Sequence, residues 1–232
     1  MPKLKGIVFY RGPSVLDGAP IVGIATMSTS NVKTGNMIQT WILRDDMSPI
    51  EAVKNGGDVS ICGICPQRHY VGGACYVTVF QAPLQVWKAY KKGLYPDLVP
   101  SQNSDCFIGR KLRLGAYGDP AAIPFEYWKI IIDLSSAHTG YTHQLKHKAF
   151  DSRIASLCMI STDTEKSSVI ATDKGYKTFR IKGIDSPLLE NEIECLADSK
   201  GLTCEQCMLC NGLKQSVAIS VHGTKAKHYK AA

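Results

Sequence analysis

Apolar residues near the start of the chain come in short runs separated by glycine, proline, serine and asparagine. The runs at residues 6–10, 21–26 and 37–43 are rich in isoleucine, valine and aromatic residues, which favour extended strands. Between residues 48 and 57, Ser48-Pro49 is typical of a helix start and Asn55-Gly56-Gly57 of a helix end. This part of the chain therefore predicts three strands followed by a short helix.

Strands then alternate with helices through the rest of the chain. The pattern predicts strands at residues 58–62, 111–117, 139–143, 156–161, 176–182 and 216–221, and helices at 82–92, 125–137 and 167–174. Because parallel strands joined by helices need cover on both faces, the alternation over residues 111–182 predicts an α/β fold. We expect a parallel or mixed sheet, or part of a barrel. With no repeat or linker in the sequence, residues 1–232 are expected to form one domain.

Polar residues follow several of these predicted strands directly. Asp119, His143 and residues 161–163 each lie just beyond a strand end, where α/β folds gather their chemistry, so we expect them on one rim. Asp119 is a candidate to hold a substrate or act as a base, and the alternative is a cap on the following helix. His143 is a candidate proton donor or ligand, and the alternative is a partly buried, hydrogen-bonded histidine. In the strand at 111–117, basic residues are expected to alternate on the outward side.

Composition narrows the class of protein. Hydrophobic residues make up 44% and charged residues 20%, which excludes a disordered chain. No apolar run approaches the roughly 18 residues of a membrane span, and the first residues lack the pattern of a signal peptide, so we expect a cytoplasmic protein without membrane contact. The net charge of +7 is compatible with an acidic partner. Nucleic-acid binding stays open but is not indicated.

Cysteine is the unusual component. Nine cysteines are an odd number, and a reducing compartment disfavours disulfides, so metal ligation or redox chemistry is the better explanation. Two cysteine-rich loops are expected, at about residues 62–75 and 195–210. Outside them, Cys158 is expected in the core and Cys106 in a polar loop as an exposed thiol.

The later loop carries the stronger pattern. Cys204, Cys207 and Cys210 follow two successive C-x-x-C steps, and Cys195 lies nine positions upstream. Closely spaced thiolates of this kind bind adjacent corners of an iron–sulfur cluster, so these four residues predict a [4Fe–4S] site. The alternative is a tetrahedral zinc site with the same ligands, although zinc sites usually pair two separated knuckles.

The earlier loop contains Cys62, Cys65 and Cys75, with His69 between them. The three cysteines are a second candidate ligand set, for a cluster or for zinc, and His69 is a further candidate ligand. A redox-active dithiol is the alternative, although that motif normally begins a helix. Whether the two loops form one shared site or two separate sites is left open at this point.

A set of ordered motifs lies along the chain, at residues 17–22, 33–35, 62–66, 75–77, 113–120, 139–144, 204–210 and 222–223. Together they resemble a family of uncharacterised proteins encoded by tailed bacteriophages and prophages. The resemblance implies a viral origin, expression in the cytoplasm of an infected bacterium, and binding of an iron–sulfur cluster. A fainter likeness to radical S-adenosylmethionine enzymes rests on Gly118-Asp119-Pro120 and the cysteine-rich tail. The C-x-x-x-C-x-x-C motif of those enzymes is absent here, so their reaction is not implied.

Three functions are consistent with these patterns. The first is an iron–sulfur protein that transfers electrons to an unidentified redox partner. The second is a cluster-dependent enzyme in which Asp119 and His143 act on a small molecule. The third is a zinc-stabilised module that binds a host protein or a nucleic acid.

Overall fold

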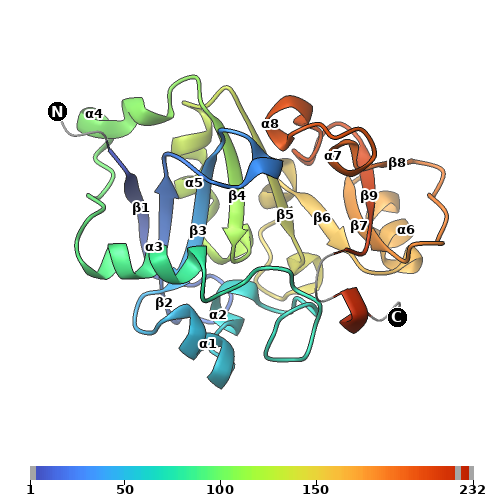
Figure 1. The fold of residues 1–232 in the computed structure, drawn as a ribbon, viewed down its shortest axis with the longest axis horizontal. Helices are drawn as coiled ribbons and strands as arrows, with labels where there is room; N and C mark the ends of the chain where they lie inside the picture. The colour runs from blue at the N-terminus through green and yellow to red at the C-terminus, as the bar shows by residue number, and fades with distance from the viewer. Residues whose placement is uncertain (1–3, 223–225, 230–232) are drawn as a thin grey trace.

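The strands form one mixed sheet of nine in the computed structural model, which describes residues 4–222 and 226–229 (Figure 1). The strand order is β1-β2-β3-β4-β5-β6-β7-β9-β8. The pairs β1–β2 and β2–β3 are antiparallel, and the other six neighbouring pairs are parallel. The predicted α/β class with a mixed sheet is therefore confirmed.

The bounds of the elements follow. The strands are β1 Gly6–Pro13, β2 Pro20–Thr26, β3 Ile38–Arg44, β4 Lys111–Tyr117, β5 Ala137–Thr142, β6 Met159–Thr162, β7 Thr178–Lys182, β8 Glu192–Glu194 and β9 Ser216–Ser220. The α-helices are α1 Pro49–Asn55, α2 Val59–Cys62, α3 Ala82–Lys91, α4 Pro100–Asn103, α5 Phe125–Ile132, α6 Glu165–Asp173, α7 Leu196–Ser199 and α8 Cys204–Cys207. Short 3₁₀ helices are η1 Val32–Thr34, η2 Ser104–Phe107, η3 Pro120–Ala122, η4 Gln144–Lys146, η5 Ser152–Ser156 and η6 Ala226–His228.

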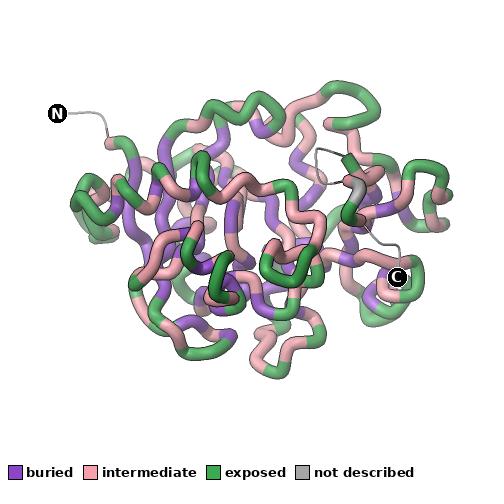
Figure 2. Tube along the Cα trace, turned by 60° about the horizontal axis from the view of Figure 1, so that its bottom comes forward, coloured by how far each residue is buried: buried purple, intermediate pink, exposed green. Residues whose placement is uncertain are grey.

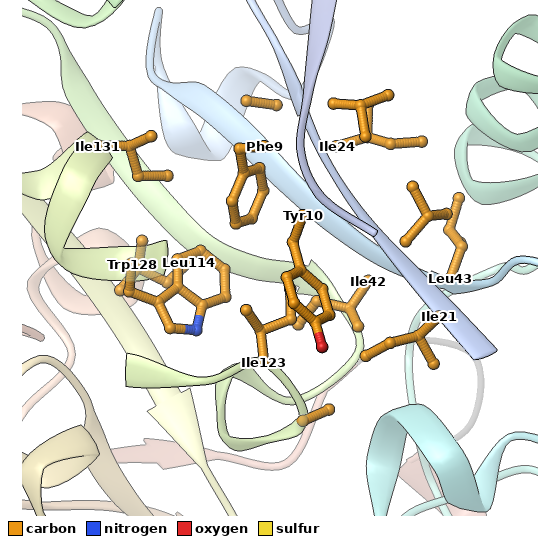
Figure 3. Packing of buried hydrophobic residues seen from close by; sticks show 14 of the residues in the cluster. Phe9, Tyr10, Ile21, Ile24, Ile42, Leu43, Leu114, Ile123, Trp128 and Ile131 are labelled. Atoms are coloured by element: carbon orange, nitrogen blue, oxygen red, sulfur yellow. The ribbon is translucent and has the colours of Figure 1, made fainter. Parts of the chain in front are cut away.

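The main core covers the antiparallel strands on both faces. In β2 every residue from Ile21 to Thr26 is buried, although successive side chains of a strand point to opposite faces. On one of these faces, Trp128 of α5 packs against Phe9 of β1 with ring centroids 4.9 Å apart (Figure 3). The indole Nε1 of Trp128 also donates to the carbonyl of Pro120, so the largest core side chain has no unpaired donor. Figure 2 shows the buried strands running through the centre of the molecule.

Local signals explain why α1 was predictable. Ser48 and Glu51 form a reciprocal capping box, Pro49 occupies the first turn, and Gly56 ends the helix with φ = 82°. Only glycine adopts that left-handed conformation without a steric cost from a Cβ atom. The predicted helix 48–57 is confirmed by this arrangement.

Three predicted element boundaries were wrong. The segment predicted as a strand at residues 58–62 contains the helical turn α2, Val59–Cys62. The turn buries Ser60 and Ile61 and leaves Val59 exposed. In sequence, so short an apolar run does not distinguish a strand from a helical turn. The helix predicted to reach residue 137 ends at Ile132, and Ala137 already begins β5. Residues 152–156 form the 3₁₀ helix η5, so the strand predicted from residue 156 begins only at Met159.

The far edge of the sheet is fixed by a buried ion pair. Arg180 of β7 contacts Glu192 of β8 at 2.6 Å, and each side chain is only 2% exposed. Burial alone would raise the pKa of Glu192, but Arg180 outweighs burial and holds that pKa below its ordinary value of 4.5.

In the described residues no helix has the length and apolar character to cross a membrane.

Replacement of Trp128 by alanine is expected to lower the free energy of unfolding by about 3–5 kcal/mol, because it leaves a cavity in the main core. Urea denaturation measures the change. Ile130→Ala on the same helix is the control, since Ile130 is 39% exposed and its loss should cost less than about 1 kcal/mol. Equal losses for the two variants would contradict the packing described here.

Glu192→Gln is expected to reduce stability at pH 7 by about 3–5 kcal/mol, because Arg180 is left buried without its counter-charge. The lowered pKa of Glu192 means that its carboxylate stabilises the fold fully above pH 4.5 and loses this effect as the pH falls through the folded-state pKa. The difference between wild type and variant should therefore shrink below pH 4.5. Denaturation curves at pH 7 and pH 3.5 test this, and a constant difference would argue against it.

Candidate metal centre

The four C-terminal cysteines come together on the face of β5. Cys195 follows β8, Cys204 and Cys207 are the first and last residues of α8, and Cys210 lies in the loop before β9. All four line one small cavity together with Thr139, Tyr141, Ala197, Met208 and Leu209. The later cysteine-rich loop thus places its four candidate ligands around a common space.

Local backbone geometry explains this convergence. Thr203 and Gln206 form a capping box that starts α8. Met208 then adopts φ = 51°, the one positive φ of a non-glycine residue in the described part of the chain, and reverses the direction of the loop. The amide of Gly140 in β5 donates to the carbonyl of Cys210 at 2.9 Å, which attaches the loop to the sheet.

The thiols at this site are held in a poorly solvated environment. Burial raises the pKa of Cys210 to about 12, against a smaller opposing effect of the Tyr141 hydroxyl. Burial also raises the pKa of Cys204, and the guanidinium of Arg113 opposes that effect. Because thiolates, not thiols, ligate metals, a metal at this site would displace these protons.

Two basic residues of β4 face the site. Lys111 Nζ donates to the carbonyl of Glu205 in α8 at 2.7 Å. Arg113 lies beside Thr139 in the strand register and donates from Nη2 to the hydroxyl of Tyr76 at 2.7 Å. The expectation that these basic residues point outward was wrong, because α8 and the residue 62–80 segment cover that side of β4.

The N-terminal cysteines form a second group. Cys62 ends α2, and Gly63 turns the chain with φ = 52° toward Cys65. Burial raises the pKa of Cys62, and the thiols of Cys65 and Cys75 raise it further. The predicted ligand His69 has its Nε2 2.7 Å from the carbonyl of Val77.

Hydrogen bonds hold this loop against the carboxyl ends of the parallel strands, at the lower edge of the sheet in Figure 1. The buried side chain of Gln144, just after β5, donates to the Cys62 carbonyl at 2.9 Å and accepts from the Ile64 amide at 3.1 Å. Gln67 donates to Asp163, which follows β6, at 2.8 Å. The C-x-x-C turn therefore has a fixed position relative to the sheet.

Asp119 and His143 lie on the rim where the sequence placed them. The Asp119 carboxylate accepts from the amides of Ala121 and His143 and from the side chain of Gln144. The Ala121 contact is the capping role offered as the alternative for Asp119. Because three donors occupy its two oxygens, Asp119 is well suited to connect the ends of β4 and β5.

His143 contacts both the cysteine loop and the next strand end. Its Nε2 is buried and lies 3.5 Å from Asp163 Oδ2, without a hydrogen bond to any described residue. Burial alone would lower the pKa of His143, but Cys65 and Asp163 outweigh burial and hold that pKa well above its ordinary value. The imidazole is thus positioned as a donor beside the sulfur of Cys65.

The remaining candidates lie outside both groups. Cys158 is 1% exposed, which confirms its assignment to the core. Cys106 is only partly exposed, and its thiol donates to the Asn103 carbonyl. The expectation of an exposed thiol was therefore wrong, because the 3₁₀ helix η2 turns the sulfur of Cys106 inward. His222 is exposed, and Gly223 lies outside the described residues. All nine cysteines are free thiols.

Within residues 4–222 and 226–229, no three His, Cys, Asp or Glu side chains converge closely enough to hold a single metal ion. The four C-terminal cysteines nevertheless line one cavity. No protein-family model, curated protein or solved structure matches the chain. Evidence for a function therefore comes from the geometry of these residues.

Sequence reasoning missed the residues that position the cysteines. Gln144 belongs to the motif at residues 139–144 and Gln67 to none, but neither was predicted to hold the cysteine loop, because their partners lie 82 and 96 positions away in the chain. Arg113 was recognised in the motif at residues 113–120 and in the basic alternation of a predicted strand, but not as a neighbour of the cysteines. The C-x-x-C steps gave a signal because the ligands of one loop are close in sequence.

Gln144→Ala is expected to loosen the Cys62–Cys65 turn, because it removes partners from Cys62, Ile64 and Asp119. The expected loss is about 1–3 kcal/mol of stability, with faster alkylation of Cys62 in the reduced, metal-free protein. Mass spectrometry of the labelled cysteines measures this. Gln215→Ala, at an exposed site that bonds to Asn191, is the control. Equal alkylation of Cys62 in wild type and Gln144→Ala would show that Gln144 does not hold the turn.

Proposed function

We propose that this chain binds an iron–sulfur cluster through Cys195, Cys204, Cys207 and Cys210 and uses it in electron transfer. The observation that carries the proposal is the convergence of these four cysteines on one cavity. Three of them come from a C-x-x-C-x-x-C segment, a spacing that bacterial cluster-binding loops share. A [4Fe–4S] cluster would supply the one-electron chemistry when bound.

The sequence spacing of the cysteines favours a cluster over zinc, because zinc sites usually pair two separated C-x-x-C knuckles. A tetrahedral zinc ion draws four sulfur atoms to about 2.3 Å from one point. A cluster instead distributes its ligands over several irons, so the thiolates stand further apart. Within the described residues no three His, Cys, Asp or Glu side chains are arranged to hold a metal ion, so the preference for a cluster comes from the cysteine spacing and the shared cavity. Zinc remains the alternative that metal analysis tests.

Charge and solvation around the site also support a cluster. Arg113 and Lys111 lie on the cysteine-bearing side of β4, where positive charge can balance thiolates and sulfides. Apolar side chains form much of the cavity wall, and low solvent access is one of the factors that set a cluster potential. An electron-transfer protein needs such a cluster near a partner surface and no substrate cavity beside it.

We propose Cys62, Cys65 and Cys75 as ligands of a second metal centre. Two buried polar atoms near them make no hydrogen bond to a described residue: Arg68 Nε and Tyr117 Oη. Buried donors are normally paired with an acceptor. The sulfur atoms of a bound centre are acceptors that fit these donors.

A second function has one specific observation in its favour. His143, with its buried Nε2, lies between Cys65 and Asp163 at the carboxyl ends of β5 and β6. Ligands of open α/β sheets bind at such ends. In this alternative the protein is an enzyme in which His143 donates a proton to a small molecule, and Asp119 holds the His143 backbone in place.

The partner and the setting also belong to the proposal. The net charge of +7 favours an acidic redox partner, and the motif resemblance to phage proteins favours the cytoplasm of an infected bacterium.

Anaerobic purification followed by iron, sulfide and zinc analysis tests the proposal. We expect a brown protein with visible absorption bands that dithionite bleaches, and we expect Cys204→Ser and Cys207→Ser to lose most of the C-terminal cluster's iron. Cys106→Ser is the matched control, because Cys106 lies outside both cysteine groups and should keep full iron content.

A colourless protein with stoichiometric zinc would overturn the iron–sulfur proposal. Iron that survives in both Cys204→Ser and Cys207→Ser at wild-type stoichiometry would assign the cluster elsewhere. Under the enzyme alternative, His143→Gln would abolish turnover of a small molecule while leaving iron content unchanged.

A further inference from the structure

We propose that Arg113 sets the reduction potential of the cluster at Cys195, Cys204, Cys207 and Cys210, and that its contact with Tyr76 links this cluster to the Cys62–Cys75 loop. The inference rests on the proposed function. Arg113 would act as a positioning residue that balances charge at the C-terminal site and contacts the N-terminal loop. The sequence alone did not decide whether these two loops form one site or two.

The strand register places Arg113 beside the C-terminal cysteines. It pairs with Thr139 of β5, and Thr139 lines the cysteine cavity. Lys111, two residues earlier on the same face of β4, bonds to the carbonyl of Glu205, which lies between Cys204 and Cys207. Arg113 therefore lies on the strand face that α8 covers. The effect of its charge on the pKa of Cys204 agrees with this placement.

Tyr76 connects Arg113 to the other cysteine group. Tyr76 directly follows Cys75 in the chain, and its hydroxyl accepts from Arg113 Nη2 at 2.7 Å. The guanidinium is thus connected to Cys75 through one hydrogen bond, the side chain of Tyr76 and one peptide bond. The two cysteine groups are separate in position but share this contact.

The charge of Arg113 has no carboxylate partner among the described residues. Arg113 forms no ion pair with a described Asp or Glu. Five other arginines do form such ion pairs: Arg11, Arg44, Arg68, Arg153 and Arg180. Its Nε is buried and makes no hydrogen bond to a described residue. A buried guanidinium donor with only a phenol as partner is suited to an anionic acceptor, and thiolate or sulfide sulfur is the acceptor that the proposed cluster provides.

Electrostatics gives the direction of the effect. Reduction adds one electron to the cluster and makes its total charge more negative, while no bond to the protein forms or breaks. A nearby cation stabilises the reduced form more than the oxidised form, and low solvation strengthens the interaction. Removal of the cation should therefore make the reduction potential more negative.

The test is a dithionite titration of the anaerobically prepared full-length protein, followed by visible absorption and electron paramagnetic resonance. We expect Arg113→Gln to lower the equilibrium constant for cluster reduction at least tenfold. For a one-electron couple, a tenfold change shifts the reduction potential by about 59 mV, here to a more negative value. Arg113→Lys keeps the charge and should shift the potential less. Arg110→Gln is the matched control, because Arg110 bonds to the carbonyls of Met27 and Asn36.

Tyr76→Phe keeps the test decisive if Arg113→Gln fails to fold. It leaves the guanidinium in place but removes its anchor to the Cys62–Cys75 loop, so we expect a smaller shift in the same direction. An unchanged reduction potential in Arg113→Gln, at wild-type iron and sulfide content, would overturn this inference and leave the proposed function intact. If Arg113→Gln does not fold, the same result in Tyr76→Phe would overturn it. Absence of a cluster from wild type would instead overturn the proposed function.

Discussion

The hydrogen bond from the Gly140 amide to the Cys210 carbonyl fixes the C-terminal cysteine loop on β5, and both candidate sites depend on that strand. One face of β5 presents Thr139 and Tyr141 to the cysteine cavity. Its carboxyl end leads into His143 and Gln144, which contact the N-terminal cysteine loop. Gly140 itself must stay small, because a Cβ atom there would lie 2.7 Å from the sulfur of Cys158.

This arrangement explains how two loops far apart in sequence approach one sheet. The parallel strands β4, β5 and β6 bring their ends to a common edge, where Asp119 and Gln67–Asp163 connect the turns. The C-terminal loop instead lies on the strand face near the start of β4, as the bond from Lys111 to α8 indicates. Arg113, midway along β4, lies between the two.

Buried sulfur imposes an electrostatic requirement on the fold. Burial raises the pKa of Cys62 and of Cys210, so these residues remain protonated until a metal or a positive charge stabilises the thiolate. Under the proposed function, bound iron together with Arg113 and His143 would meet that requirement. The surrounding charge thus matters as much as the number of cysteines.

The sequence by itself determined most of the strands, the α/β class and the two cysteine groups, because periodicity, helix caps and C-x-x-C spacing are properties of neighbouring residues. It also determined that Asp119 and His143 lie on one rim, since parallel strand ends share an edge. Only the tertiary structure decided that residues 58–62 are helical, that Arg113 turns inward and that Gln144 holds the Cys62–Cys65 turn. Those outcomes depend on contacts between distant segments, and a local sequence pattern does not encode which segments will meet.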